Sequence, residues 1–71
     1  MSRYQDNVIS LIKRDIREKG ITQKDFSDKL GISEASLSRY LAKQRTFSLT
    51  IAIKLADYFN ISLDSLVGRN N

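Results

Sequence analysis

Four segments of the chain place a Ser or Thr directly after one apolar residue and four residues before another. In such a pattern the hydroxyl accepts a hydrogen bond from a free N–H in the first turn of a helix, and the two apolar side chains pack together. The clear cases are Ile21-Thr22 with Phe26, Ile32-Ser33 with Leu37 and Ile61-Ser62 with Leu66, and the weaker case is Phe47-Ser48 with Ala52. This repetition in a chain of 71 residues predicts one packed, all-α domain over residues 1–71.

The expected helix ends agree with these starts. Gly20, Gly31 and Asn60 occupy positions where a left-handed residue would end a helix. Starts and stops together predict helices at about 2–19, 23–30, 34–42, 49–59 and 63–67, the first opening with a capping box from Ser2 to Gln5. Helical spacing assigns the following residues to the core: Tyr4, Val8, Leu11, Ile12, Ile16, Phe26, Leu30, Leu37, Tyr40, Leu41, Leu49, Ala52, Leu55, Ala56 and Phe59.

Composition excludes several classes of function. The chain has no cysteine and no histidine, which removes disulfides, thiolate metal sites, the commonest metal ligand and the commonest general base. The carboxylates are scattered over helix starts and surfaces, so we expect no enzyme activity, no catalytic residue, no cofactor and no metal. No apolar run approaches the roughly 20 residues that cross a bilayer, and the N-terminal residues lack the apolar core of a signal peptide. We therefore expect a cytoplasmic protein without membrane contact.

The net charge of +4 is mild and alone favours a nucleic-acid partner only slightly. Its distribution is more informative, because basic residues gather in two places. One group, Lys13, Arg14, Arg17 and Lys19, lies on the first helix, and for the first three of these a solvated face is the better interpretation. The other group, Arg39, Lys43 and Arg45, lies in and after the third helix.

The link between the second and third helices is very short. Leu30-Gly31-Ile32-Ser33 leaves almost no free chain, Gly31 can adopt the positive φ of a sharp corner, and Ser33 starts the next helix at once. Since helices below roughly 12 residues are marginal alone, the rest of the domain must hold both. The arrangement predicted at about 22–42 is a helix-turn-helix.

At this point the sequence resembles the Cro and phage-repressor type of helix-turn-helix proteins, the lambda-repressor-like DNA-binding domains. The resemblance covers about residues 5–68. It rests on Gln23, Gly31, Ile32-Ser33 and Leu37, followed by a tail from Leu49 to Gly68 that is similar to the family's closing helices. It implies a compact five-helix domain of prokaryotic or phage type that regulates transcription by binding double-stranded DNA, as a small repressor.

The resemblance implies that helix 34–42 reads the major groove. The candidate base-reading residues are Glu34, Ala35, Ser36, Ser38 and Arg39. Arg39 can donate two hydrogen bonds to guanine, and Ala35 can touch a thymine methyl group. Arg39 could instead be solvated or pair with Glu34 or Glu18. Glu34 could accept from cytosine or only favour the positive end of the helix dipole.

The candidate phosphate-binding residues lie on either side of this helix. They are Thr22, Gln23, Lys24, Ser33, Lys43, Gln44 and Arg45. A helix N-terminus presents free N–H groups to an anion, and in the family the glutamine matching Gln23 holds a phosphate. Gln23 could instead be an ordinary surface residue, and Lys43 and Arg45 could be solvated loop charges.

Five positions depart from the family pattern. Ser27 replaces the usual alanine, and we expect its hydroxyl to bond back to its own helix. Lys43 replaces a common glycine and Phe47 a common proline, which makes the loop shape less predictable. Many members have an arginine and a glutamate that pair where this chain has Ile16 and Leu41, so we predict that these two side chains touch.

One such domain reads few base pairs, so specificity favours a homodimer on two half-sites. The resemblance places the dimer surface at the last helix, with Leu63, Val67 and Phe47 as candidates. The chain would be a stand-alone regulator or a DNA-binding domain excised from a larger one. The alternative is an antitoxin-like interaction module whose main partner is a protein.

Overall fold

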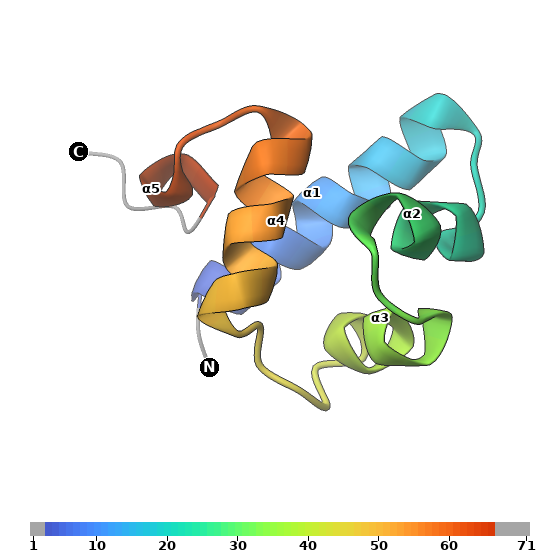
Figure 1. The fold of residues 1–71 in the computed structure, drawn as a ribbon, viewed down its shortest axis with the longest axis horizontal. Helices are drawn as coiled ribbons and strands as arrows, with labels where there is room; N and C mark the ends of the chain where they lie inside the picture. The colour runs from blue at the N-terminus through green and yellow to red at the C-terminus, as the bar shows by residue number, and fades with distance from the viewer. Residues whose placement is uncertain (1–2, 67–71) are drawn as a thin grey trace.

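The computed structural model describes the backbone of residues 3–66 and the side chains of residues 5–66. This part of the chain is all-helical (Figure 1). Its elements are α1 (Arg3–Lys19), α2 (Gln23–Leu30), α3 (Glu34–Leu41), α4 (Leu49–Phe59) and α5 (Leu63–Leu66). The predicted fold class and the order of the helices are confirmed. Within the described residues only the end of α3 differs, at Leu41 instead of residue 42, while the predicted ends at residues 2 and 67 lie outside them.

The predicted caps start the helices. The Thr22 hydroxyl accepts a hydrogen bond from the Asp25 N–H at 3.0 Å, and the Asp25 carboxylate accepts from the Thr22 N–H at 3.1 Å, which completes a capping box. Ser33, Ser48 and Ser62 accept from the N–H three residues later at 3.0, 3.2 and 3.0 Å. The box expected at Ser2 lies outside the described residues.

The first four helices end in the same way. Gly20, Gly31, Lys43 and Asn60 adopt φ values of 64°, 80°, 63° and 57°. In each case the N–H of the following residue donates to a carbonyl five residues back, at 3.2 Å for Ile21, 3.0 Å for Ile32, 2.9 Å for Gln44 and 3.0 Å for Ile61. This is the Schellman arrangement. Three of the four were predicted, whereas Lys43 carries a side chain into a conformation that usually disfavours one.

The core takes side chains from every helix. The residues that are completely buried include Val8, Ile12, Phe26, Leu37, Leu55 and Leu66. The ring of Phe26 meets Tyr58 edge to face, with the ring centroids 5.0 Å apart. At the outer end of this contact the Tyr58 hydroxyl donates to Asp15 at 2.6 Å, which ties α4 to α1. None of the helices within residues 3–66 has the length and apolar character needed to cross a membrane.

Two residues near the start of α4 lie differently from the prediction. Leu49, assigned to the core by spacing, is 67% exposed. Phe47 is only 5% exposed and stacks on Tyr40, with centroids 4.7 Å apart. Because helical side chains tilt toward the N-terminus, the first residue of α4 points beyond the end of the core, and Phe47 fills the interior there.

The other departures from the family pattern gave mixed results. Ser27 is completely buried, and its hydroxyl donates to the Lys24 carbonyl at 2.7 Å, as expected. Ile16 and Leu41 are partly buried, and both pack against the core cluster, as do Leu11 and Phe59. Direct contact between Ile16 and Leu41 stays a prediction.

Candidate nucleic-acid interface

α2 and α3 form a compact corner at one side of the molecule. Figure 1 shows α3 below α2, at the lower right of the molecule. The N–H of Gly31 donates to the Ser27 carbonyl at 2.9 Å and holds the corner. Inward side chains from both helices hold it as well. These are Phe26, Leu30, Leu37 and Tyr40. The predicted helix-turn-helix is therefore present, and its second helix keeps an outward face.

That outward face carries the predicted base-reading residues. Glu34, Ala35, Ser38 and Arg39 are exposed, while Leu37 and Tyr40 on the opposite side of α3 are buried. Neither Arg39 nor Glu34 forms an ion pair within the part of the chain that the structure describes. The alternative in which Arg39 pairs with Glu34 or Glu18 is thus not seen, and the guanidinium can meet another partner.

Ser36 differs from its neighbours because it takes part in the helix cap. It is half-buried, and its hydroxyl oxygen accepts from the Ser33 hydroxyl at 3.0 Å. Its N–H donates to the Ser33 oxygen at 3.0 Å. Ser36 therefore retains its own O–H and one lone pair for an outside partner, and Ser33 is mainly a cap.

The start of α2 presents backbone donors. The N–H groups of Gln23 and Lys24 belong to the first turn, which has no intrahelical acceptors for them. Hydrogen bonds from the backbone and hydroxyl of Thr22 hold the pKa of Asp25 below its usual value, so this carboxylate stays ionised within the cap. Gln23 is half-buried. The Lys24 ammonium forms an ion pair with the Asp28 carboxylate, with nitrogen and oxygen 3.7 Å apart. The residues predicted here are brought together at one helix end.

The loop between α3 and α4 is held by the first turn of α1. The side-chain amide of Gln5, 8% exposed, donates to the Arg45 carbonyl at 2.8 Å and the Tyr40 carbonyl at 3.3 Å. The Lys43 ammonium lies 2.5 Å from a carboxylate oxygen of Asp6. The guanidinium of Arg45 lies 5.2 Å from the centroid of the Tyr40 ring. All three loop candidates, Lys43, Gln44 and Arg45, are exposed.

Sequence reasoning assigned Gln5 only to a capping box with Ser2, and it did not single out Asp6. A signal existed for Gln5, because it precedes Val8 and Ile12 on the buried stripe of α1 at helical spacing. No local signal pointed to Asp6, since its partner lies in a distant loop. A hydrogen bond from Lys43, with the attraction of its charge, holds the pKa of Asp6 below the usual value.

The predicted dimer surface stays a prediction, with one of its residues corrected. Leu63 is 37% exposed on α5, while Phe47 belongs to the core and is corrected, and Val67 lies outside the described residues. Among residues 5–66, the large apolar side chains that are exposed lie on α4 and around α5. They are Leu49, Ile53, Ile61 and Leu63.

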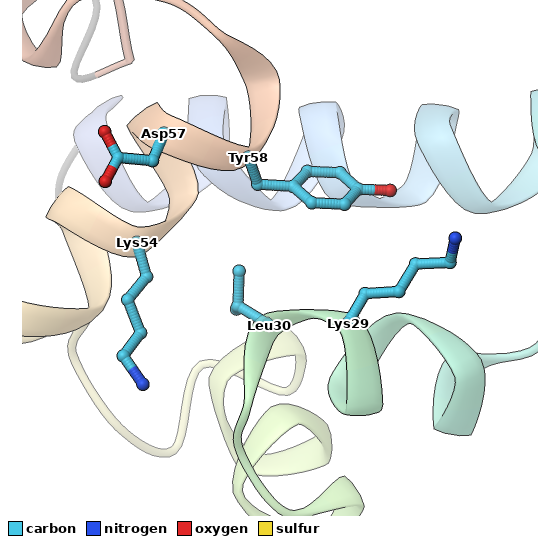
Figure 2. Close-up of a pocket in the computed structure, with 5 residues that line it drawn as sticks. All are labelled: Lys29, Leu30, Lys54, Asp57 and Tyr58. Carbon is cyan, nitrogen blue, oxygen red and sulfur yellow. The ribbon is translucent and has the colours of Figure 1, made fainter.

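An open hollow of about 340 Å³ lies between α2 and α4 (Figure 2). Leu30 forms part of its floor, Lys29 and Lys54 border it from the two helices, and Asp57 and Tyr58 complete the lining. This set contains one carboxylate and no adjacent nucleophile and base, so it does not form a catalytic constellation. Within residues 3–66 no group of three or more acidic side chains could hold a metal ion.

The comparisons agree with this geometry. A family model described as helix-turn-helix (HTH_3) matches residues 12–66. The HTH-type transcriptional regulator ImmR of Bacillus subtilis (strain 168) is 37% identical over 65 residues, or 87% of this chain and 51% of that protein. A crystal structure of a transcriptional regulator from Listeria innocua is similar with a TM-score of 0.72 at 22% identity, over 100% of this chain and 64% of the other. The chain thus spans about half the length of the curated relative, and the structural likeness shows the fold.

Proposed function

Because the chain belongs to the helix-turn-helix family of DNA-binding transcriptional regulators, we propose that it is a sequence-specific repressor that reads the major groove with α3. The observation that carries the proposal is the outward face of α3, where Arg39 is exposed and has no ion-pair partner among the described residues. A helix of this width fits the major groove. Because the similar proteins come from bacteria, we also propose that the protein acts in the cytoplasm of a prokaryotic cell.

Arg39 is the principal reader in this proposal. Its guanidinium donates two hydrogen bonds to O6 and N7 of a guanine, a pairing worth about 1–3 kcal/mol of discrimination. Ala35 and Ser38 are small and exposed, which lets the backbone of α3 approach the base edges. Glu34 either accepts from a cytosine amino group or stabilises the helix start.

The phosphate contacts lie at both ends of this face. The amides of Gln23 and Lys24 and the positive end of the α2 dipole meet one strand of the duplex. Lys43, Gln44 and Arg45 in the loop after α3 meet the backbone on the other side of the groove. Such contacts set the register of the protein and carry no base preference of their own.

We also propose that the protein binds its operator as a homodimer. Half-sites are read about 34 Å apart by two copies of such a domain. The exposed side chains of Ile53 and Leu63 on α4 and α5 supply apolar surface for a second copy. Light scattering with operator-like DNA should give the mass of two chains per site, and Ile53→Asn or Leu63→Asn should lower it. Thr50→Asn, at an exposed polar position of α4, serves as the control, and a monomer at high concentration with DNA would contradict the dimer.

Selection from random-sequence duplexes, repeated at several salt concentrations, tests the DNA proposal. A specific half-site with a steep loss of affinity as salt rises is expected, because phosphate contacts release counterions. Arg39→Ala should relax one base position, and Lys43→Ala should weaken all sequences about equally. Lys13→Ala, on an exposed face of α1, is the charge-matched control. No base preference together with a shallow salt dependence would overturn the proposal.

A further inference from the structure

The ion pair between Asp6 and Lys43 joins the first turn of α1 to the loop proposed to contact phosphate. The two charged atoms are 2.5 Å apart, and the side chains of Lys43 and Asp6 are 60% and 62% exposed. An anion from solution can therefore reach the Lys43 ammonium. It would arrive beside a carboxylate that already neutralises much of this charge.

The backbone on both sides of this ion pair is held in place. The buried amide of Gln5, adjacent to Asp6, is bonded to the carbonyls of Tyr40 and Arg45 on either side of Lys43. The Schellman bonds at the end of α3 hold Lys43 at its positive φ. Both charged residues thus project from anchored backbone. The fold therefore keeps the Asp6 carboxylate and the Lys43 ammonium near each other.

We propose that Asp6 competes with DNA phosphate for Lys43 and so lowers the affinity of the free protein for the DNA backbone. The inference rests on the proposed phosphate contact of Lys43. A phosphate oxygen must displace the Asp6 carboxylate from the Lys43 ammonium or share that ammonium with it. Two anions bound to one ammonium lie close together and repel each other. Since backbone contacts do not depend on sequence, Asp6 weakens binding to unrelated duplexes as well as to the operator.

The first test removes the competing charge. Asp6→Asn should bind both the selected operator and an unrelated duplex about two- to fivefold more tightly, which is the range expected for one exposed ion pair. The gain should shrink as salt rises, because exposed charges are screened. Asp57→Asn makes the same charge change on the last turn of α4, away from α3 (Figure 1), and should give a smaller gain. Equal gains from the two variants would overturn the proposal.

The second test combines the changes in a double-mutant cycle. In a Lys43→Ala background, Asp6→Asn should gain no more than Asp57→Asn does. A full gain there would show that Asp6 acts through general charge and not through Lys43. Circular dichroism checks that all variants are folded, and Asp6→Ser provides a second neutral replacement if Asp6→Asn frays α1.

The outcomes separate this inference from the proposed function. If Lys43→Ala binds every duplex as tightly as the original protein, the phosphate contact itself is wrong. If Lys43→Ala weakens binding while Asp6→Asn matches Asp57→Asn, only the competition by Asp6 is wrong.

Discussion

Gln5 links the start of α1 to the loop after α3, and its replacement by methionine tests that link. Methionine keeps an apolar stem of similar length on the buried stripe and removes the amide. The bond to the Arg45 carbonyl, at 2.8 Å, is lost completely. The longer bond to the Tyr40 carbonyl, at 3.3 Å, is also lost, but this oxygen still accepts from the Lys43 N–H at 3.1 Å.

These contacts allow the cost to be worked out. One well-formed hydrogen bond contributes about 0.5–1.5 kcal/mol, and a buried acceptor left without a partner costs about 1–3 kcal/mol. Because Tyr40 keeps a second donor and the bond to Arg45 is only part-buried, we expect Gln5→Met to lower the free energy of unfolding by about 1–2 kcal/mol, less than the full cost of a buried unpaired acceptor. In a domain of this size, 1 kcal/mol corresponds to a fall in Tm of about 4–8 °C.

Urea denaturation followed by circular dichroism measures this change. The transition midpoint should fall while its slope stays constant, which would show that the surface exposed on unfolding is unchanged. Gln44→Met, at an exposed position of the same loop, should change the stability by less than about 0.5 kcal/mol. If the two variants are equally stable, the buried amide does not hold the loop, and the reasoning fails.

Three further predictions concern the corner, the α1–α4 tie and the capping box. Gly31→Ala should cost about 1–2 kcal/mol in urea denaturation, because φ is +80° while the added Cβ would meet Lys54 Nζ at an ordinary 3.5 Å; no loss would contradict a conformational cost. Tyr58→Phe keeps the ring against Phe26 and removes both the bond to Asp15 and the bond that the hydroxyl accepts from Lys19, so we expect a loss of about 1–2 kcal/mol by the same measurement, and Tyr58→Leu should lose more. The pKa of Asp25 is lowered on folding, so its contribution is present above the unfolded value of 3.8 and is lost as pH falls through the folded value. The stability difference between the original protein and Asp25→Asn should therefore narrow below about pH 4, and a difference that is constant with pH would refute this assignment.

Much of the fold follows from local sequence patterns. Thr22 and Ser33 start helices because a hydroxyl at that position satisfies free amides, whatever the rest of the chain does. Gly31 ends α2 because its missing side chain permits a positive φ. The outward face of α3 follows as well, since Leu37 and Tyr40 must be buried and the helical period then places Arg39 outside.

Other features depend on contacts between distant segments. Periodicity could not show that Leu49 lies beyond the end of the core, because the burial of Phe47 against Tyr40 sets where that core ends. Lys43 occupies a left-handed position that a sequence pattern assigns to glycine.

The sequence by itself determined the helices, the corner and the face of α3, because each depends on residues within a few turns of one another. Only the tertiary structure decided how the loop after α3 is held. Gln5 and Asp6 meet this loop when α1 packs beside it, and the same contact decides whether the Lys43 charge is free or paired. A polar bond between segments far apart in the chain produces no repeating pattern in the sequence, because each partner leaves the residues around the other unconstrained.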